Sequence, residues 1–265
     1  MTDNLLLPVT DAEEAASLLQ HLPIALDREK FLRFVIGFPR EYLINTPRNE
    51  IVKHYFLFES LPGKQVISSL SLQQDLWKLS LVTLDRHSLF SRICGTLSCF
   101  GMNIVSAKAF ANANSLVLDT FFFSDPEEAF TQEEQRRHFQ HFLEEVVEGK
   151  KDLEPLLESR LKRMSPSAPQ EWAVEFEIES HPSATLLLLD CHDHFGLLYR
   201  VARCISAEGH DIEMAYVQTP GRRVHDEFYL SHEGSKLSPA MQENLKQKLI
   251  GLGKEYMDLG PSDNE

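Results

Sequence analysis

The sequence is poor in basic residues, with 26 Lys and Arg against 40 Asp and Glu and a formal net charge of −14 over 265 residues. Nucleic acids and anionic membrane surfaces attract clustered positive charge, so this balance argues against either as a partner. The sequence also lacks any apolar run near the ~20 residues that a membrane-spanning helix needs. Its start, Met1 to Asn4, has neither the basic nor the apolar region of a signal peptide, so we expect a cytoplasmic protein.

Cysteine is scarce as well. The four cysteines are Cys94, Cys99, Cys191 and Cys204, each set singly in an apolar stretch without a C-x-x-C pair. This pattern indicates reduced, packed thiols rather than disulfides. The apolar share of 43% is ordinary for a globular protein, and the length suits about two domains.

What the sequence does contain is an internal repeat, whose first copy begins near Leu84 and whose second copy begins near His192. The matched pairs are Asp85 and Asp193, Leu89 and Leu197, Phe90 and Leu198, Arg92 and Arg200, Gly101 and Gly209, Ile104 and Ile212, Asp119 and Asp226, and Phe121 and Phe228. A repeat of this kind predicts two copies of one small module.

Hydrophobic periodicity and turn residues predict the same order of elements in both copies. In the first we expect strands over Val66–Leu72 and Leu76–Leu84, a helix over Ser88–Phe100, strands over Ile104–Ala111 and Ser115–Phe123, and a helix over Thr131–Val147. In the second we expect strands over Ala173–Glu179 and Thr185–Asp190, a helix over Gly196–Glu208, strands over Ile212–Thr219 and Arg223–Leu230, and a helix over Pro239–Leu249.

The part before the first module is predicted to be helical. Helices are expected over Asp11–His21 and Asp27–Ile36, and a third starts at Thr46-Pro47, where a capping hydroxyl precedes a proline. The composition of Ser165 to Pro169 is typical of a linker, and the tail from Gly260 is polar. The expected division is a helical segment over 1–62, module 1 over 63–150, a linker over 151–170, module 2 over 171–252 and a tail over 253–265.

The order strand, helix, strand, strand, helix in each module is the skeleton of the ferredoxin-like split βαβ fold. Neither module has a strand after its last helix, but each has an extra strand before its first helix. We infer that this leading strand replaces the missing fourth strand and gives the same sheet by a permuted route. The predicted class is α+β, with two ferredoxin-like modules that each form an antiparallel sheet with two helices on one face.

Three motifs of the first module carry a family resemblance. Asp85-Arg-x-x-Leu-Phe-x-Arg-Ile93, Gly101-x-Asn-Ile104 and Leu118-Asp-Thr-Phe121 resemble the ACT domain, a small regulatory module that binds amino acids. The resemblance therefore implies that both modules are ACT modules.

Other segments sharpen the resemblance to one source, the C-terminal tandem ACT region of bacterial PII-protein uridylyltransferase/uridylyl-removing enzymes of nitrogen metabolism. They are Phe38 to His54, Glu175 to His181 and Gly196 to Ala202, and the resemblance covers roughly residues 38 to 250. Those enzymes also carry a nucleotidyltransferase domain and an HD phosphohydrolase domain, and neither motif set is found in this sequence. His192-Asp193 lacks the companion motifs of an HD site. The sequence thus predicts a sensor without catalytic residues, cofactor or metal.

The resemblance also implies a ligand site at an interface between modules, near the loop from first strand to first helix, where helix N-terminal amides can receive a carboxylate. The matching positions are Thr83, Asp85, Ser88, Leu89 and Asn103 in module 1, and Cys191, Asp193, Gly196, Leu197 and Asp211 in module 2. Asp85 and Asn103 are expected to hold an α-ammonium and an amide together. Glutamine is the first ligand that the resemblance implies.

The sequence departs from the family in this loop, where the family has Pro-Gly. Module 1 has His87-Ser88, and Ser88 is expected to narrow its pocket because only glycine lets a ligand approach the backbone closely. In module 2, Asp193 and Asp211 are expected to repel a carboxylate. The two sites are therefore predicted to differ.

Structural explanations stay open for the same residues. Asp85 and Asp193 suit the cap of a helix, and Asn103 suits the turn after Gly101. The cluster Cys191-His-Asp-His194 offers metal ligands, but its tight spacing suits a four-ligand cage poorly.

The leading hypothesis is a regulator that senses a small amino acid and signals through a protein partner or its own oligomeric state. The alternatives are an interaction scaffold that has lost its ligand and the regulatory part of a split uridylyltransferase.

Overall fold

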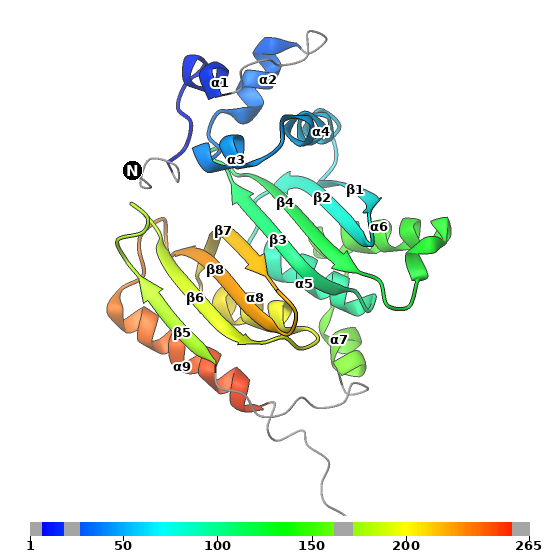
Figure 1. Ribbon diagram of the computed structural model, residues 1–265, viewed down its shortest axis with the longest axis vertical. Helices are drawn as coiled ribbons and strands as arrows, with labels where there is room; N and C mark the ends of the chain where they lie inside the picture. Colours follow the sequence, from blue (N-terminus) through cyan, green and yellow to red (C-terminus); the bar gives the residue numbers. More distant parts are fainter. Residues whose placement is uncertain (1–6, 19–26, 162–171, 256–265) are drawn as a thin grey trace, which may run out of the picture.

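The computed structural model describes residues 7–18, 27–161 and 172–255. Its centre is one eight-stranded antiparallel sheet in the order β1-β2-β4-β3-β7-β8-β6-β5 (Figure 1). The strands are β1(Val66–Gln73), β2(Leu76–Leu84), β3(Asn103–Ala111), β4(Leu116–Ser124), β5(Ala173–Glu177), β6(Thr185–His192), β7(Asp211–Gln218) and β8(Arg223–Ser231). The predicted linker at Ser165 to Pro169 and the tail from Gly260 lie outside the described residues.

Each half of the sheet has the strand order that the permuted route predicts. The leading strand β1 pairs antiparallel with β2, from Val66 opposite Thr83 to Gln73 opposite Leu76. In the second half β5 pairs with β6 in the same way. The order β1-β2-β4-β3 is that of a ferredoxin-like sheet in which the strand from the N-terminal side takes the place of the fourth. The predicted α+β class with two ferredoxin-like modules is confirmed.

The two halves join through β3 and β7, which makes one sheet out of two modules. At the centre of this pairing Lys108 lies opposite Tyr216, and these two residues occupy equivalent positions of the repeat. A β-bulge also recurs at equivalent positions, between Ile104 and Ser106 and between Ile212 and Met214. The modules are therefore related by a pseudo-twofold axis through the middle of the sheet.

One face of the sheet carries the helices of both modules, which lie behind it in Figure 1. They are α5(Leu89–Cys99) and α6(Glu133–Val147) of the first module and α8(Leu197–Ala207) and α9(Pro239–Glu255) of the second. Helices α5 and α8 meet across the pseudo-twofold axis at Gly95, where an added Cβ would lie 2.9 Å from Cδ2 of Tyr199. Phe90 and Phe228 also pack across it, with ring centroids 6.4 Å apart. The two modules therefore share one hydrophobic core.

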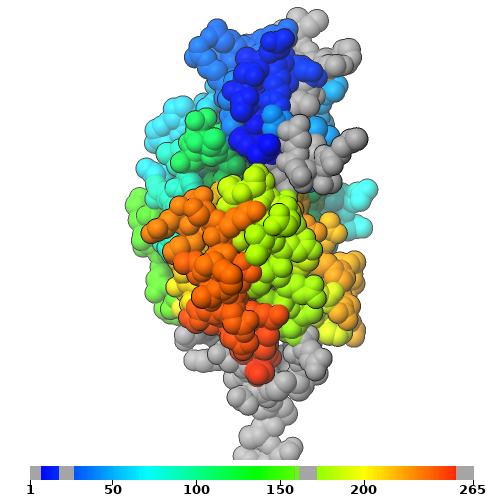
Figure 2. Space-filling view, turned by 90° about the vertical axis from the view of Figure 1, so that its left-hand side faces the viewer, coloured from blue at the N-terminus to red at the C-terminus, as the bar shows by residue number. Residues whose placement is uncertain are grey.

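The opposite face of the sheet is covered at one end by the N-terminal helices. The sequence predicted helices in this part of the chain, but not the surface that they cover. These are α1(Ala12–Leu18), α2(Arg28–Val35), α3(Arg40–Asn45) and α4(Arg48–Glu59). Phe34, Tyr42 and Tyr55 pack in a second core cluster with Phe110 and Met214 of the sheet. In Figure 2 these helices form a lobe beyond α9 and the yellow-green segment that contains β5. Residues 19–21 of the predicted first helix lie outside the described part.

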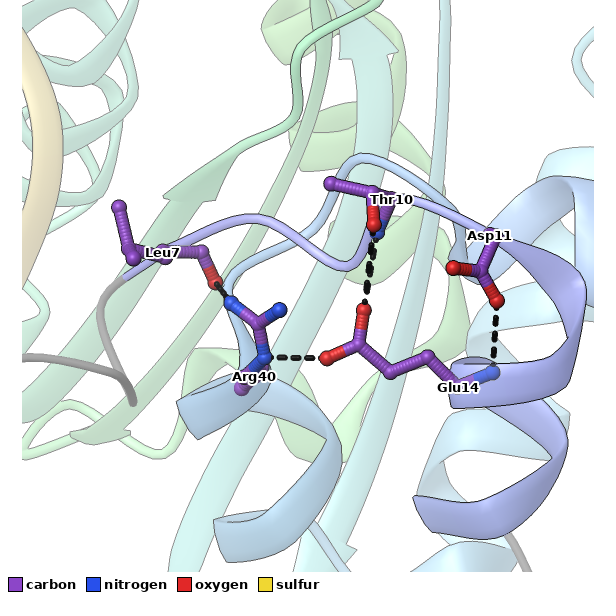
Figure 3. Close-up of polar contacts among 5 residues, drawn as sticks. All are labelled: Leu7, Thr10, Asp11, Glu14 and Arg40. Atoms are coloured by element: carbon purple, nitrogen blue, oxygen red, sulfur yellow. Dashed lines mark hydrogen bonds and ion pairs between the residues drawn. The ribbon is translucent and has the colours of Figure 1, made fainter.

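A polar cluster fastens α1 to the start of α3 (Figure 3). The Glu14 carboxylate forms an ion pair with Arg40 and accepts the Thr10 N–H at 3.1 Å. The Arg40 guanidinium also donates to the Leu7 carbonyl at 3.3 Å, and the Glu14 N–H donates to the Asp11 carboxylate at 2.8 Å. Both ionic side chains are largely buried, so their hydrogen bonds are needed to offset the loss of water.

Two short elements complete the described chain, η1(Ala129–Thr131) and α7(Glu154–Leu161). Helix α7 lies in the segment expected to be a linker, and its Arg160 side chain reaches back to the end of α5. None of the described helices has the length and apolarity needed to cross a membrane.

Candidate ligand-binding site

The loop between β2 and α5 forms one wall of a junction between the modules. The Asp85 N–H donates to the Ser115 carbonyl at 2.8 Å, and the Asp85 carboxylate accepts the N–H of Arg86. The residue that caps α5 is Ser88, in the left-handed conformation with φ of 62°, and its equivalent Gly196 caps α8 with φ of 76°. The hypothesis that Asp85 and its counterpart cap these helices is therefore wrong, because each folds the loop ahead of the cap.

A cavity of about 40 Å³ lies behind this loop, with walls from both modules. Asp85, Ser88 and Leu89 belong to the first module, whereas Asp211 and Glu213 come from the start of β7 in the second. Its remaining lining residues are Arg86, Phe90, Ala109, Phe110, Ala111, Val117, Asp119, Ser206, His210 and Ile212. The space admits about one water molecule or a group of similar size.

The electrostatics of this cavity are set by burial and by carboxylates close to one another. Burial raises the pKa of Asp85, and the nearby Asp211 and Glu213 raise it further. Burial also raises the pKa of Asp119 well above its ordinary value, with an added contribution from Asp85. Burial lowers the pKa of His210. Carboxylates that are crowded together and partly removed from water penalise each additional negative charge, which is why the pKa values of Asp85 and Asp119 are raised.

Like Arg86, His210 and Glu213, Asp119 lines this cavity but was not predicted as a site residue. Its side chain is 1% exposed, and neither carboxyl oxygen has a hydrogen-bond partner among the described residues. A signal was present, since an aspartate stands in the otherwise apolar run Leu116–Phe123 and recurs as Asp226 in the second copy.

The predicted site residues lie at two separate module junctions, and the structure groups them differently from the prediction. Asp211 faces Asp85 of the other module rather than Asp193 of its own. Asn103 starts β3, whereas Asp85 lies beside Ser115 near the far end of that strand. The expected pairings of Asp85 with Asn103 and of Asp193 with Asp211 are therefore wrong. The loop between β2 and α5 in the first module therefore lies against the start of β7 in the second module.

Two further predicted residues have local structural partners. The Thr83 hydroxyl is buried and donates to the Gln65 carbonyl at 2.7 Å, which ties β2 to the start of β1. Cys191 is buried in β6, and burial next to Asp226 raises its pKa to about 12. Neither residue lines the first cavity. That any of the predicted residues binds a ligand stays a prediction.

The second junction holds Asp193, Gly196 and Leu197 at the loop before α8, and side chains of the protein itself occupy its entrance. The Arg160 guanidinium donates to the Cys99 carbonyl at 3.1 Å and lies 5.9 Å from the centre of the Phe195 ring. It also forms an ion pair with Glu127 and passes so close to Gly101 that a Cβ there would collide with it. Arg160 thus bridges the end of α5 and the loop before α8. These two segments form the second junction and are equivalent by the repeat to those that form the first cavity.

The histidines of this second loop do not form a metal site in the structure. His194 is half-buried, its Nδ1 lies 3.3 Å from the His192 carbonyl, and burial lowers its pKa to about 4. Across the described residues, no group of three or more His, Cys, Asp or Glu side chains is arranged to hold a metal ion.

Fold and site together define an α+β protein of two ferredoxin-like modules that share one sheet, with a small acidic cavity at one of the two module junctions. No family model matches the chain. Three curated relatives are each described as a bifunctional uridylyltransferase/uridylyl-removing enzyme. The protein from Ralstonia nicotianae is 30% identical over 173 residues, which is 62% of this chain and 20% of the relative.

Two relatives from Cupriavidus give the same result. The protein from Cupriavidus metallidurans is 29% identical over 71% of this chain and 22% of the relative. That from Cupriavidus pinatubonensis is 26% identical over 76% of this chain and 23% of the relative. The chain thus spans about a fifth of the length of these relatives. Its resemblance to part of the uridylyltransferase/uridylyl-removing enzymes is confirmed.

Among solved structures, aspartate kinase from Synechocystis matches 68% of this chain and 27% of its own. The TM-score is 0.36 and the sequence identity is 14%, so this likeness adds nothing to the assignment of fold or function.

Proposed function

We propose that this chain is a regulatory unit that binds a small amino acid at the junction between its two modules, with glutamine as the first choice. The observation that carries the proposal is the cavity shared by the β2–α5 loop of one module and the start of β7 in the other. A ligand held there touches both modules, so its binding free energy depends on how they sit against each other. Such a difference in affinity between two arrangements is what a regulatory site requires.

The polarity of the junction supports an amino acid as the ligand. The N-terminus of α5 at Ser88 carries the partial positive charge of the helix dipole, which suits a carboxylate, although the Leu89 N–H already donates to the Arg86 carbonyl at 3.0 Å. Asp85 and Asp211 supply acceptors for an ammonium group. Both charges of an amino acid therefore have a complementary partner within one junction.

The size of the cavity implies that binding is coupled to movement. A space of about 40 Å³ is too small for a whole amino acid. The half-buried Arg86 side chain lines the cavity and is bonded to the Gln65 side chain near the start of β1. Displacing Arg86 with its loop would admit the rest of the ligand and loosen the contact with β1, which links occupancy to a change in shape.

We further propose that the unit acts without a catalytic step of its own, in the cytoplasm, through a protein partner or its oligomeric state. The relatives that are described as transferring and removing uridylyl groups are about five times as long as the matched region. Regulation of such an activity, on the same chain or on another, agrees with a match to a fifth of their length.

A thermal-shift panel of the twenty amino acids tests the proposal. At about 100 times Kd a ligand should raise Tm by roughly 5–10 °C for a chain of this size. Glutamine should do so in the wild type and in Asp193→Ala, which alters the equivalent loop of the closed junction. The shift should be lost in Asp85→Ala. If no amino acid shifts Tm at millimolar concentration, the proposal fails and the ligand-free scaffold, which the small cavity favours, takes its place.

A further inference from the structure

The buried carboxyl of Asp119 lacks, among the described residues, the hydrogen bonds that a buried acid ordinarily makes. It lies on β4 beneath α5, is 1% exposed, and has no hydrogen-bond partner for either oxygen. Its counterpart Asp226 is 2% exposed but accepts the Gln218 N–H at 3.3 Å. Leaving a buried carboxyl unpaired costs folding free energy, and such a cost is typical of groups kept for binding.

Asp119 also differs from Asp226 in what it faces. Asp119 lines the cavity at the open junction, so its unpaired oxygens adjoin the enclosed space. The end of α5 and the loop at the other junction are bridged by Arg160. The same residue of the repeat is therefore available to a ligand in one module and tied to the backbone in the other.

We propose that Asp119 is the receptor for a primary ammonium group, which enters the floor of this cavity and donates hydrogen bonds to both carboxyl oxygens. We place the ligand in the same cavity as above, and in this respect the inference rests on the proposed function. It adds the chemical group that the cavity selects and the residue that selects it.

The size and lining of the cavity favour an organic ammonium over other ligand groups. A space of about 40 Å³ admits an ammonium group, which is about the size of a water molecule, with the carbon that bears it at the edge of the space. Leu89, Phe90 and Val117 form apolar walls that suit that carbon. A carboxylate at the floor would be repelled by Asp85 and Asp119, so an amino acid enters with its ammonium first.

The charges around Asp119 imply that an ammonium group binds in exchange for the proton of the Asp119 carboxyl. The groups that face it are Asp85 and Arg86 on the loop, Cys94 on α5, and His210, Asp211 and Glu213 from the second module. Burial and Asp85 raise the pKa of Asp119, so without a ligand this carboxyl keeps its proton to a higher pH than an ordinary aspartate does. An arriving ammonium displaces that proton, because an adjacent positive charge favours the carboxylate. Affinity therefore rises with pH until Asp119 is ionised in the empty protein.

Methylammonium is a probe that fits the floor of the cavity without needing the rest of the site. We would measure Tm of wild type, Asp119→Asn and the matched control Asp226→Asn in methylammonium chloride and in tetramethylammonium chloride at equal concentration. Methylammonium should raise Tm by about 2 °C or more in wild type and in Asp226→Asn, and not in Asp119→Asn. Tetramethylammonium, which has no N–H donor, should give no shift.

Calorimetric titration with glutamine supplies the second readout. Asp119→Asn should weaken binding about tenfold or more, the range for loss of a hydrogen bond to a charged group. Titrations in two buffers of different ionisation enthalpy should reveal proton release in wild type and none in Asp119→Asn. Asp119→Asn should fold, since its amide has the same shape and removes a buried acid, and circular dichroism verifies this.

The outcomes separate the two proposals. A methylammonium shift that is absent in wild type, or equal in wild type and Asp119→Asn, overturns the assignment of Asp119, even where glutamine binds and the proposed function stands. A methylammonium shift that depends on Asp119, with no amino acid bound by any variant, supports the ammonium receptor and overturns the amino acid sensor.

Discussion

The side chain of His54 joins α4 to α3 inside the second core cluster. It is 3% exposed, and its Nδ1 lies 3.0 Å from the Tyr42 hydroxyl. Burial, with a contribution from the nearby Lys78, lowers its pKa to about 4. His54 is therefore neutral at pH 7, and its protonation opposes folding because an imidazolium there would be cut off from water.

Acid should therefore destabilise the protein through His54. The unfolded chain takes up a proton near pH 6.5 and the folded chain only near pH 4, so the free energy of unfolding falls as pH drops through this window. The shift corresponds to about 3 kcal/mol. Urea unfolding at pH 7 and pH 5 should show a smaller pH effect in His54→Phe than in wild type.

His194, whose pKa is also about 4, should maintain part of the effect in His54→Phe. An identical pH dependence in wild type and His54→Phe would contradict the prediction.

For single residues, the sequence predicted the positions of site residues better than it predicted which other residues they contact. Ser88 and Gly196 were predicted at the starts of their helices, and both lie there in the left-handed conformation. Asp211 was predicted as a site residue but assigned to the wrong junction, because spacing along one module cannot show that its strand ends beside the other. Asp119 was missed because a charged residue within a strand indicates a site only when its burial and lack of partners are known.

The N-terminal helices meet the sheet through the turn between β3 and β4. The Gly37 carbonyl accepts the Ala113 N–H at 3.1 Å, and the Gly37 N–H donates to the Val9 carbonyl at 2.8 Å. Gly37 has φ of 94°, and a Cβ there would lie 3.3 Å from the Ala113 nitrogen. From the same turn, Ser115 accepts the N–H of Asp85, so two backbone hydrogen bonds connect the helices to the loop at the cavity.

Gly37→Ala should loosen this connection. The backbone conformation disfavours a side chain, and the contact with Ala113 adds strain, so we expect a loss of about 1–3 kcal/mol in the free energy of unfolding. Gly63→Ala is the matched control, because Gly63 has φ of 81° and no atom within 4 Å of its Cβ position. Equal losses in the two variants would contradict a role for the contact with Ala113.

Helix α7 should determine how many ligands one chain binds. In wild type the Arg160 side chain occupies the second junction, so calorimetry should give one amino acid per chain. Arg160→Ala removes the hydrogen bond to Cys99 and the contact with Phe195. Tm should fall by a few degrees, as for loss of a partly buried charged hydrogen bond. Asp193 and Gly196 should then be accessible to a second ligand.

Arg160→Lys is the companion variant, since lysine retains the charge but not the planar group that lies over Phe195. It should give an intermediate Tm. If Arg160→Ala still binds one ligand per chain, α7 does not close the second junction.

At the scale of elements, periodicity and turn residues predicted every strand of the sheet, and the repeat predicted the place of β1 and β5 within it. The packing of helices α1 to α4 on the face of the sheet opposite α5 and α8 was not predictable in the same way. The N-terminal helices have apolar stripes, but nothing in a stripe states which surface it meets. Helix α7 was missed because Glu154–Leu161 has no clear apolar face of its own.

For the whole molecule, the joined sheet and shared core predict one cooperative unfolding transition. Each module contains one tryptophan, Trp77 in β2 and Trp172 before β5. Fluorescence of Trp77→Phe and Trp172→Phe therefore follows one module at a time, and the two urea midpoints should coincide. Gly95→Val places a side chain between α5 and Tyr199 and should lower both midpoints together. Midpoints that differ already in the single-tryptophan variants would show that the modules unfold independently.

The repeat predicted two modules, but it could not predict that they form one sheet. The edge strand of a module can pair with its neighbour in the same chain, pair with another chain, or remain exposed, and these outcomes share one sequence pattern. What decides here is the pairing of β3 with β7, together with the small residue Gly95 where α5 and α8 cross. These are long-range complementarities that no local pattern expresses.

The blocked second junction has a consequence for the shape of a dose–response curve. Two identical modules in a symmetric dimer would offer two equal sites, and such a pair can respond steeply to a small change in ligand concentration. Fused in one chain, with Arg160 across one of the two positions, the same architecture responds along a simple hyperbola, which needs a change of about eighty-fold in concentration to go from one-tenth to nine-tenths occupied. Duplication of the module would then have produced a sensor with a gradual, non-cooperative response to ligand concentration in place of a steep, cooperative one.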